Sequence, residues 1–111
     1  MAKKLEFAML LDCYGELLTE KQRKAMELYY YEDLSYAEIG EPDEISRQAA
    51  CGLIKRSESL LLMYEEKLGM AKQLVAMRQC LENINNAADS ISDSNIKNAI
   101  KNEVNNGIKL L

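Results

Sequence analysis

Apolar residues recur along most of the chain every three or four positions, the spacing of amphipathic helices and not the alternation of strands. Six helical segments are expected: 3–18, 19–31, 35–41, 47–68, 70 to a turn near 89–94, and from 94 onward. The single proline, the five glycines and the many Leu, Ala, Glu and Lys residues also favour helix over sheet. The sequence therefore predicts an all-α fold.

Three polar positions mark where the central helices begin. Thr19 with Gln22, and Ser35 with Glu38, each fit a capping box, in which the two side chains satisfy backbone N–H groups at the helix start. Ser46 is the expected N-cap of the long segment, because a serine hydroxyl accepts a hydrogen bond from the first helical turn. These caps divide the middle of the chain into three separate helices.

Residues 35–57 show a short helix, a turn and a longer capped helix, which is the order of a helix-turn-helix. Pro42 limits the short helix to Gly40 or Glu41, because proline inside a helix removes a hydrogen bond and clashes with the preceding turn. The side chains expected to face the core are Ala37, Ile39, Ile45, Ala49 and Ile54. Two amphipathic helices with a polar surface and no DNA-reading role explain the same pattern.

A helix-turn-helix that reads DNA places polar residues from the start of its second helix in the major groove. Arginine and glutamine suit guanine and adenine edges, and serine, lysine and arginine suit phosphates. The candidate nucleic-acid-binding residues are Ser46, Arg47, Gln48, Lys55 and Arg56. Residues 46–57 carry three basic side chains and no acid. The net charge of −4 nevertheless opposes binding through bulk electrostatics.

The C-terminal third of the chain has a different pattern. Residues 70–91 carry apolar side chains at alternating spacings of four and three, which is typical of a coiled-coil seam: Met70, Leu74, Met77, Leu81, Ile84, Ala88 and Ile91. This seam predicts a homodimer, and packing of the helix on its own N-terminal domain is the alternative. We therefore divide the chain into a helix-turn-helix domain, residues 1–68, and a helical extension with a possible role in dimerisation, residues 69–111.

Catalytic and metal chemistry find little support in the sequence. Histidine is absent, and there is no glycine-rich phosphate loop and no nucleophile with a base partner. Cys13, Cys51 and Cys80 lack metal-ligand spacing, so we expect them to be buried small apolar side chains in a reducing compartment. We predict no enzyme activity, no catalytic residue, no metal and no cofactor.

The N-terminal segment does not resemble a targeting signal. Glu6 and Asp12 interrupt its apolar stretch, and no apolar run in the chain approaches the roughly 20 residues of a membrane span. The expected location is the cytoplasm, without insertion into a membrane.

Eight short motifs follow one another over roughly half of the chain: LLT at 17–19, KQR at 21–23, ELYY at 27–30, DLS at 33–35, EI at 38–39, SRQA at 46–49, IKR at 54–56 and YEEKL at 64–68. Together they resemble the YlxM family of small bacterial proteins, which is associated with the signal recognition particle and related to region four of sigma factors. The resemblance implies an all-α, sigma region-four-like or winged-helix-like helix-turn-helix with a helical tail. It also implies a regulatory protein with a part in the signal recognition particle pathway, whose components would be partners. A sequence-specific DNA-binding transcriptional regulator without a targeting role is the alternative function.

The chain departs from the family pattern inside the motif. The family usually has alanine at the position of Gly40, a core aromatic at Asp43, and valine and tyrosine at Ala50 and Cys51; Pro42 is unusual as well. An aspartate in place of a buried aromatic either becomes exposed through a shifted turn or costs several kcal/mol of desolvation. Valine truncated to alanine leaves space in the core. We therefore expect an altered turn between the two helices.

Overall fold

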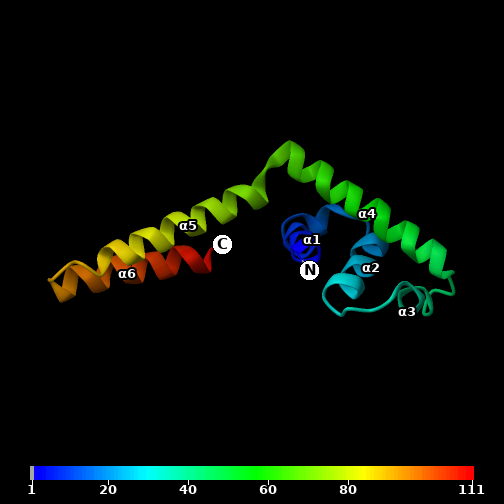
Figure 1. Ribbon diagram of the computed structural model, residues 1–111, viewed down its shortest axis with the longest axis horizontal. Coiled ribbons are helices and arrows are strands. Elements are labelled where there is room, and N and C mark those ends of the chain that lie inside the picture. The colour runs from blue at the N-terminus through cyan, green and yellow to red at the C-terminus, as the bar shows by residue number, and fades with distance from the viewer. Residues whose placement is uncertain (1) are drawn as a thin grey trace. The chain divides into compact units, whose positions relative to one another are not determined.

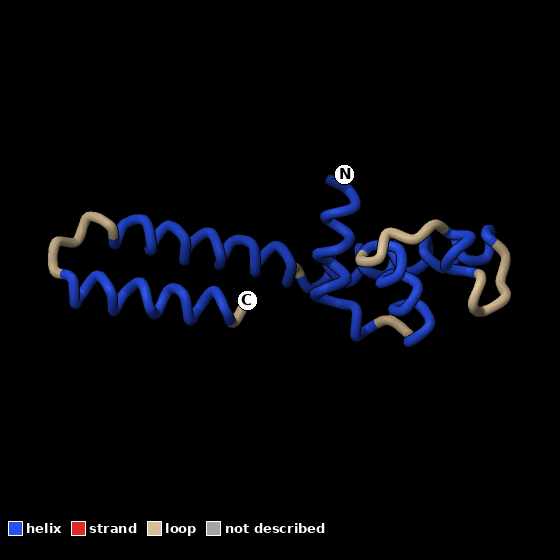
Figure 2. Tube along the Cα trace, turned by 90° about the horizontal axis from the view of Figure 1, so that it is seen from below, coloured by secondary structure: helices blue, strands red, loops and turns tan. Residues whose placement is uncertain are grey.

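A computed structural model describes residues 2–111, with side chains from residue 4 onward, and the described part is all helical (Figures 1 and 2). Its elements are α1 (Ala2–Tyr14), the 3-10 turn η1 (Gly15–Leu17), α2 (Glu20–Tyr30), α3 (Tyr36–Gly40), α4 (Arg47–Leu68), α5 (Met70–Ala88) and α6 (Ser94–Lys109). The all-α prediction is confirmed. The chain divides into two compact units, the first ending at Ala71 and the second covering Lys72–Leu111, and each is described by itself.

The three expected N-caps are present. Both capping boxes form, because the side chains of Thr19 and Ser35 accept from the N–H groups of Gln22 and Glu38 and those side chains accept in return. The Ser46 hydroxyl accepts from the Ala49 N–H at 3.0 Å. The first helix is shorter than expected and ends at Tyr14 instead of residue 18. The chain must be extended to enter the Thr19 cap, so a 3-10 turn replaces the last helical turn.

The first unit is built around α4, against which α1, α2 and α3 pack (Figure 1). Four residues of α4 are completely buried, at spacings of four, three and four: Ala50, Ile54, Ser57 and Leu61. This is one face of a helix at 3.6 residues per turn. Ser57 is tolerated there because its hydroxyl donates to the Leu53 carbonyl at 2.8 Å. The long helix therefore serves as the common wall of the core.

The core-facing positions of the helix-turn-helix were predicted only in part. Ile39 and Ile54 are buried and Ile45 is partly buried against the core, as expected. Ala37 and Ala49 are exposed, so their assignment to the core is wrong. Alanine is found on both buried and exposed helix faces, so its identity does not predict which face it occupies. In α4 the neighbouring Ala50 takes the core position.

The turn between α3 and α4 closes tightly on Gly40. The Ile45 N–H donates to the Gly40 carbonyl at 3.0 Å, and a Cβ on residue 40 would lie 2.5 Å from the Ile45 carbonyl oxygen. Asp43 is exposed, which is the first of its two expected outcomes. Pro42 and Asp43 line a recess of about 30 Å³ beside the apolar side chains of the core. Positions 40–43 thus all lie at or beside the turn between α3 and α4.

A buried tyrosine holds the end of α4. The Tyr14 hydroxyl donates to the Glu65 carboxylate at 2.6 Å and accepts from the Met70 N–H at 3.0 Å. The same carboxylate accepts from the Ala71 N–H at 3.0 Å. Gly69 ends α4 in the left-handed conformation, with φ of 62°, which suits glycine. These bonds satisfy backbone donors at the start of α5 that the helix itself leaves unpaired.

The second unit is an antiparallel pair of helices, α5 and α6 (Figure 2). Asp93 caps α6, and Asp89 in the connecting turn pairs with Lys101 at 2.6 Å, which lowers the pKa of that carboxyl. Cys80 is exposed and Cys13 and Cys51 are half-buried, so burial of all three thiols is wrong. Within the described residues, no helix has both the length and the apolar character that crossing a membrane requires.

Candidate nucleic-acid interface

The five candidate residues all belong to the first three turns of α4 or to its cap, and all five are exposed. The hydroxyl of Ser46 accepts from the Ala49 N–H as the N-cap, which pairs one of the backbone N–H groups that the first turn of α4 leaves without a partner in the helix. A helix start of this kind attracts anions, because its free N–H groups and its dipole point at the approaching charge. The start of α4 is thus a polar, accessible surface suited to a phosphate or a base edge.

Arg47 is held against an aromatic stack. Its guanidinium carbon lies 5.7 Å from the centre of the Tyr36 ring, and the Tyr36 ring stacks on Tyr29 at 5.1 Å with an interplanar angle of 14°. A cation placed over a ring in this way is stabilised by about 0.5–1 kcal/mol at an exposed site. The stack therefore restricts the Arg47 side chain near the first turn of α4 while leaving it exposed.

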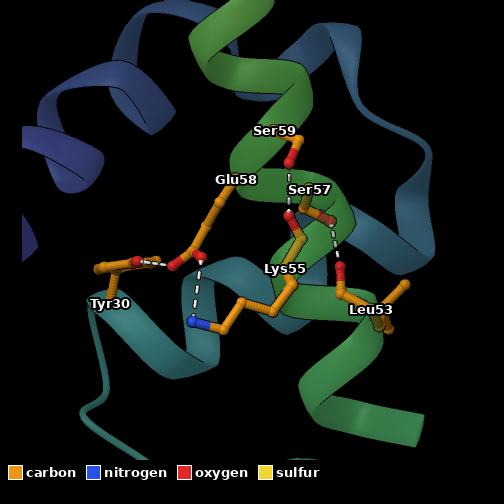
Figure 3. A network of polar contacts seen from close by, with 6 residues as sticks. All are labelled: Tyr30, Leu53, Lys55, Ser57, Glu58 and Ser59. Atoms are coloured by element: carbon orange, nitrogen blue, oxygen red, sulfur yellow. Dashed lines mark hydrogen bonds and ion pairs between the residues drawn. The ribbon is translucent and has the colours of Figure 1, made fainter.

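Lys55 has a partner that the sequence pattern did not reveal. Its ammonium lies 4.0 Å from the Glu58 carboxylate, which also accepts a hydrogen bond from the Tyr30 hydroxyl (Figure 3). The Glu58 side chain is only 13% exposed, against 61% for Lys55. A weakly exposed carboxylate needs such partners to offset its desolvation. The Glu58 carboxylate therefore offsets part of the attraction that Lys55 exerts on a phosphate.

The two arginines of the candidate set do not lie on the same side of α4. Nine residues separate Arg47 from Arg56, which places their side chains about 180° apart around the helix. Gln48 and Lys55 lie between them on the exposed side. Arg56 instead lines a wide groove of about 520 Å³ together with Gln22, Lys55, Ser59, Leu60 and Met63. The structure thus brings Ser46, Arg47 and Gln48 together at the start of α4, whereas Lys55 lines the groove beside Arg56.

An acidic turn precedes this surface. Glu41, Asp43 and Glu44 are all exposed between α3 and α4, and Glu44 has a left-handed φ of 56°. Three carboxylates beside the start of α4 repel phosphates and offset the attraction of Arg47 and Lys55. Counting basic residues within 46–57 alone therefore overstated the positive charge of the surface.

Several tyrosines of the first unit resist ionisation. Burial, followed by the hydrogen bond to Glu58, raises the pKa of Tyr30; burial and the hydrogen bond to Asp12 raise the pKa of Tyr31. The hydrogen bond to Tyr29, followed by burial, raises the pKa of Tyr36. The pKa of Tyr14 is raised by burial and by Glu65. Each folded-state pKa thus lies above the usual value of about 10.

We therefore expect the protein to lose stability above about pH 10. A group with a raised folded-state pKa contributes stability below its unfolded-state pKa and loses that contribution as the pH rises. An absorbance titration of phenolate should show most of the tyrosines ionising later than in the same chain in denaturant. Coincident native and denatured curves, with the protein still folded, would contradict these shifts.

The fold and this surface define an all-helical helix-turn-helix protein. Residues 1–104 match the family described as "Putative helix-turn-helix protein, YlxM / p13 like", UPF0122. The chain belongs to this family, and the resemblance drawn from the sequence is confirmed. That description names a helix-turn-helix and no catalytic activity.

Relatives across several bacteria agree with this assignment. A UPF0122 protein of Clostridium kluyveri is 43% identical over 111 residues, covering 97% of this chain and 100% of the relative. One of Clostridium perfringens strain 13 is 45% identical over 101 residues, covering 91% and 88%. One of Halalkalibacterium halodurans is 44% identical over 92 residues, covering 83% and 84%. The likeness therefore extends over nearly the full length of the proteins compared.

Proposed function

We propose that this protein is a regulator that contacts duplex DNA through the helix-turn-helix of α3 and α4. The observation that carries the proposal is the exposed, Ser46-capped start of α4, where Arg47 is held by Tyr36 beside Gln48. Arginine and glutamine in the first turn of a second helix are placed to meet base edges, while the cap and Lys55 are placed to meet phosphates.

The same geometry implies that the helix-turn-helix of a single chain binds DNA weakly. Lys55 shares its charge with Glu58, and the turn before α4 carries three exposed acids. Few phosphates are neutralised by such a surface, so the affinity should be low at physiological salt and should rise as the salt concentration falls.

Two arginine variants test the proposal. Arg47→Ala is expected to weaken binding to duplex DNA about tenfold, or about 1.4 kcal/mol, in fluorescence anisotropy measured across salt concentrations. Arg56→Ala makes the same charge change on the opposite edge of α4 and is expected to leave binding nearly unchanged. Equal losses in both variants would reject the assigned face, and no salt-dependent binding by the wild type would reject the DNA contact.

A second candidate is a protein contact within the signal recognition particle pathway. It is favoured by the acidic surface of the first unit, where a groove of about 460 Å³ is lined by three acids, Asp12, Glu16 and Glu27, and one base, Arg23. An acidic surface suits the basic face of an RNA-binding protein. Co-purification from cells tests this candidate, and recovery of no targeting-pathway component would count against it.

A further inference from the structure

The α5–α6 hairpin buries few of its apolar side chains completely. Among the described apolar side chains of Lys72–Leu111, only Ala88 and Val104 are buried, and the buried cluster of the molecule lies within residues 7–71. Two helices of 19 and 16 residues that bury so little are marginal in water, because helix nucleation and side-chain ordering outweigh such contacts. The hairpin therefore needs a further apolar surface against it.

One side of the hairpin carries an apolar groove of about 400 Å³, lined by Leu81, Ile84, Ala99, Ile100, Glu103 and Val104. Helical periodicity places Met77 on the same side of α5 and Ile96 on the same side of α6, and both are 53% exposed. We define the open face as these apolar positions: Met77, Leu81, Ile84, Ile96, Ala99 and Ile100. It runs along both helices and includes one acidic side chain, because Glu103 lines the same groove and lies seven positions after Ile96 on the same side of α6.

We propose that the open face packs against the same face of a second copy of this chain, so that two hairpins form a four-helix bundle. In a dimer with two-fold symmetry each patch meets its own equivalent, so one apolar face that spans two helices supplies both sides of the interface. The alternating four- and three-residue spacing of Met77, Leu81 and Ile84 is the spacing of side chains that interdigitate between bundle helices.

Charge and size both favour a second copy as the occupant. Residues 72–111 carry five basic and four acidic side chains, so two hairpins do not repel each other strongly. The ion pairs of Asp89 with Lys97 and Lys101 lie at the turn, away from the open face. Covering the open face and its margins removes on the order of 1,000 Å² from water over both copies, the size that a specific dimer needs.

The decisive measurement is the mass of the full chain by light scattering and sedimentation over a wide concentration range. The wild type is expected at twice the 12.6 kDa of one chain. Ile84→Glu places a charge in the middle of the open face and is expected to weaken dimerisation about 100-fold or more. Near-ultraviolet circular dichroism of the tyrosines, all of which lie within residues 14–64, reports whether the first unit of that variant stays folded.

Val75→Glu is the matched control. Val75 is 52% exposed and Ile84 48%, and nine residues separate them, so they point to opposite sides of α5. A dimer that is lost in Ile84→Glu and retained in Val75→Glu supports the proposal. A wild-type monomer at millimolar concentration, a larger oligomer, an unaffected Ile84→Glu dimer or equal dissociation of both variants would each overturn it.

Discussion

Replacing Gly40 by alanine is expected to lower the free energy of unfolding by about 1–3 kcal/mol. Alanine is the better helix former, so propensity alone predicts the opposite sign. The cost comes from contact: the new Cβ would lie 2.5 Å from the Ile45 carbonyl oxygen, a backbone atom that moves only with the turn. To relieve this clash, the hydrogen bond from the Ile45 N–H to the Gly40 carbonyl must break and the backbone before α4 must move.

Gly52→Ala is the matched substitution. Gly52 lies inside α4, and a Cβ there would meet only the guanidinium of Arg56 at 3.1 Å, the far end of a flexible side chain. Alanine should therefore stabilise the protein by about 0.5–1 kcal/mol. Urea unfolding of both variants, followed by circular dichroism, separates the two effects. A Gly40→Ala protein as stable as the wild type would show that the α3–α4 turn is looser than the structure has it.

The parts of the fold that the sequence revealed are those decided by neighbouring residues. Thr19, Ser35 and Ser46 cap their own helices within three residues, so the starts of α2, α3 and α4 could be predicted without any tertiary contact. Gly69, in the left-handed conformation at the end of α4, belongs to the same class of local signal.

Features that depend on distant residues were missed. The hydrogen bond from Tyr30 to Glu58 joins residues 28 positions apart and could not be predicted from helix spacing, unlike the Lys55–Glu58 ion pair at i,i+3. The Tyr36 ring that holds Arg47 follows from how α3 packs on α4. Acidic residues at 41–44 were visible in the sequence, but their exposure beside the start of α4 depends on the conformation of the turn. The exposure of the candidate residues at the start of α4 could thus be predicted, but the charge around them could not.

Dissociating the proposed dimer into single chains is expected to halve the slope with which DNA affinity depends on salt concentration. In the proposed complex each helix-turn-helix surface contacts few phosphates, and the proposed dimer contacts twice as many on one duplex. The slope of log affinity against log salt concentration is proportional to the number of phosphates neutralised. Ile84→Glu should therefore show about half the wild-type slope. It should also bind about 100-fold more weakly to a duplex long enough for both helix-turn-helix surfaces of a dimer. On a short duplex with room for only one helix-turn-helix surface, the variant and the wild type should bind with the same affinity.

Val75→Glu adds the same charge to α5 and should keep the wild-type slope and affinity. This comparison rests on both the DNA contact and the dimer, and its outcomes separate them. A wild type that dimerises but shows no salt-dependent binding contradicts the DNA contact alone. An Ile84→Glu monomer with an unchanged slope shows that one unit makes the whole contact with DNA. A slope that halves only when the open face is charged would mean that weak, partly neutralised surfaces gain useful affinity by acting in pairs.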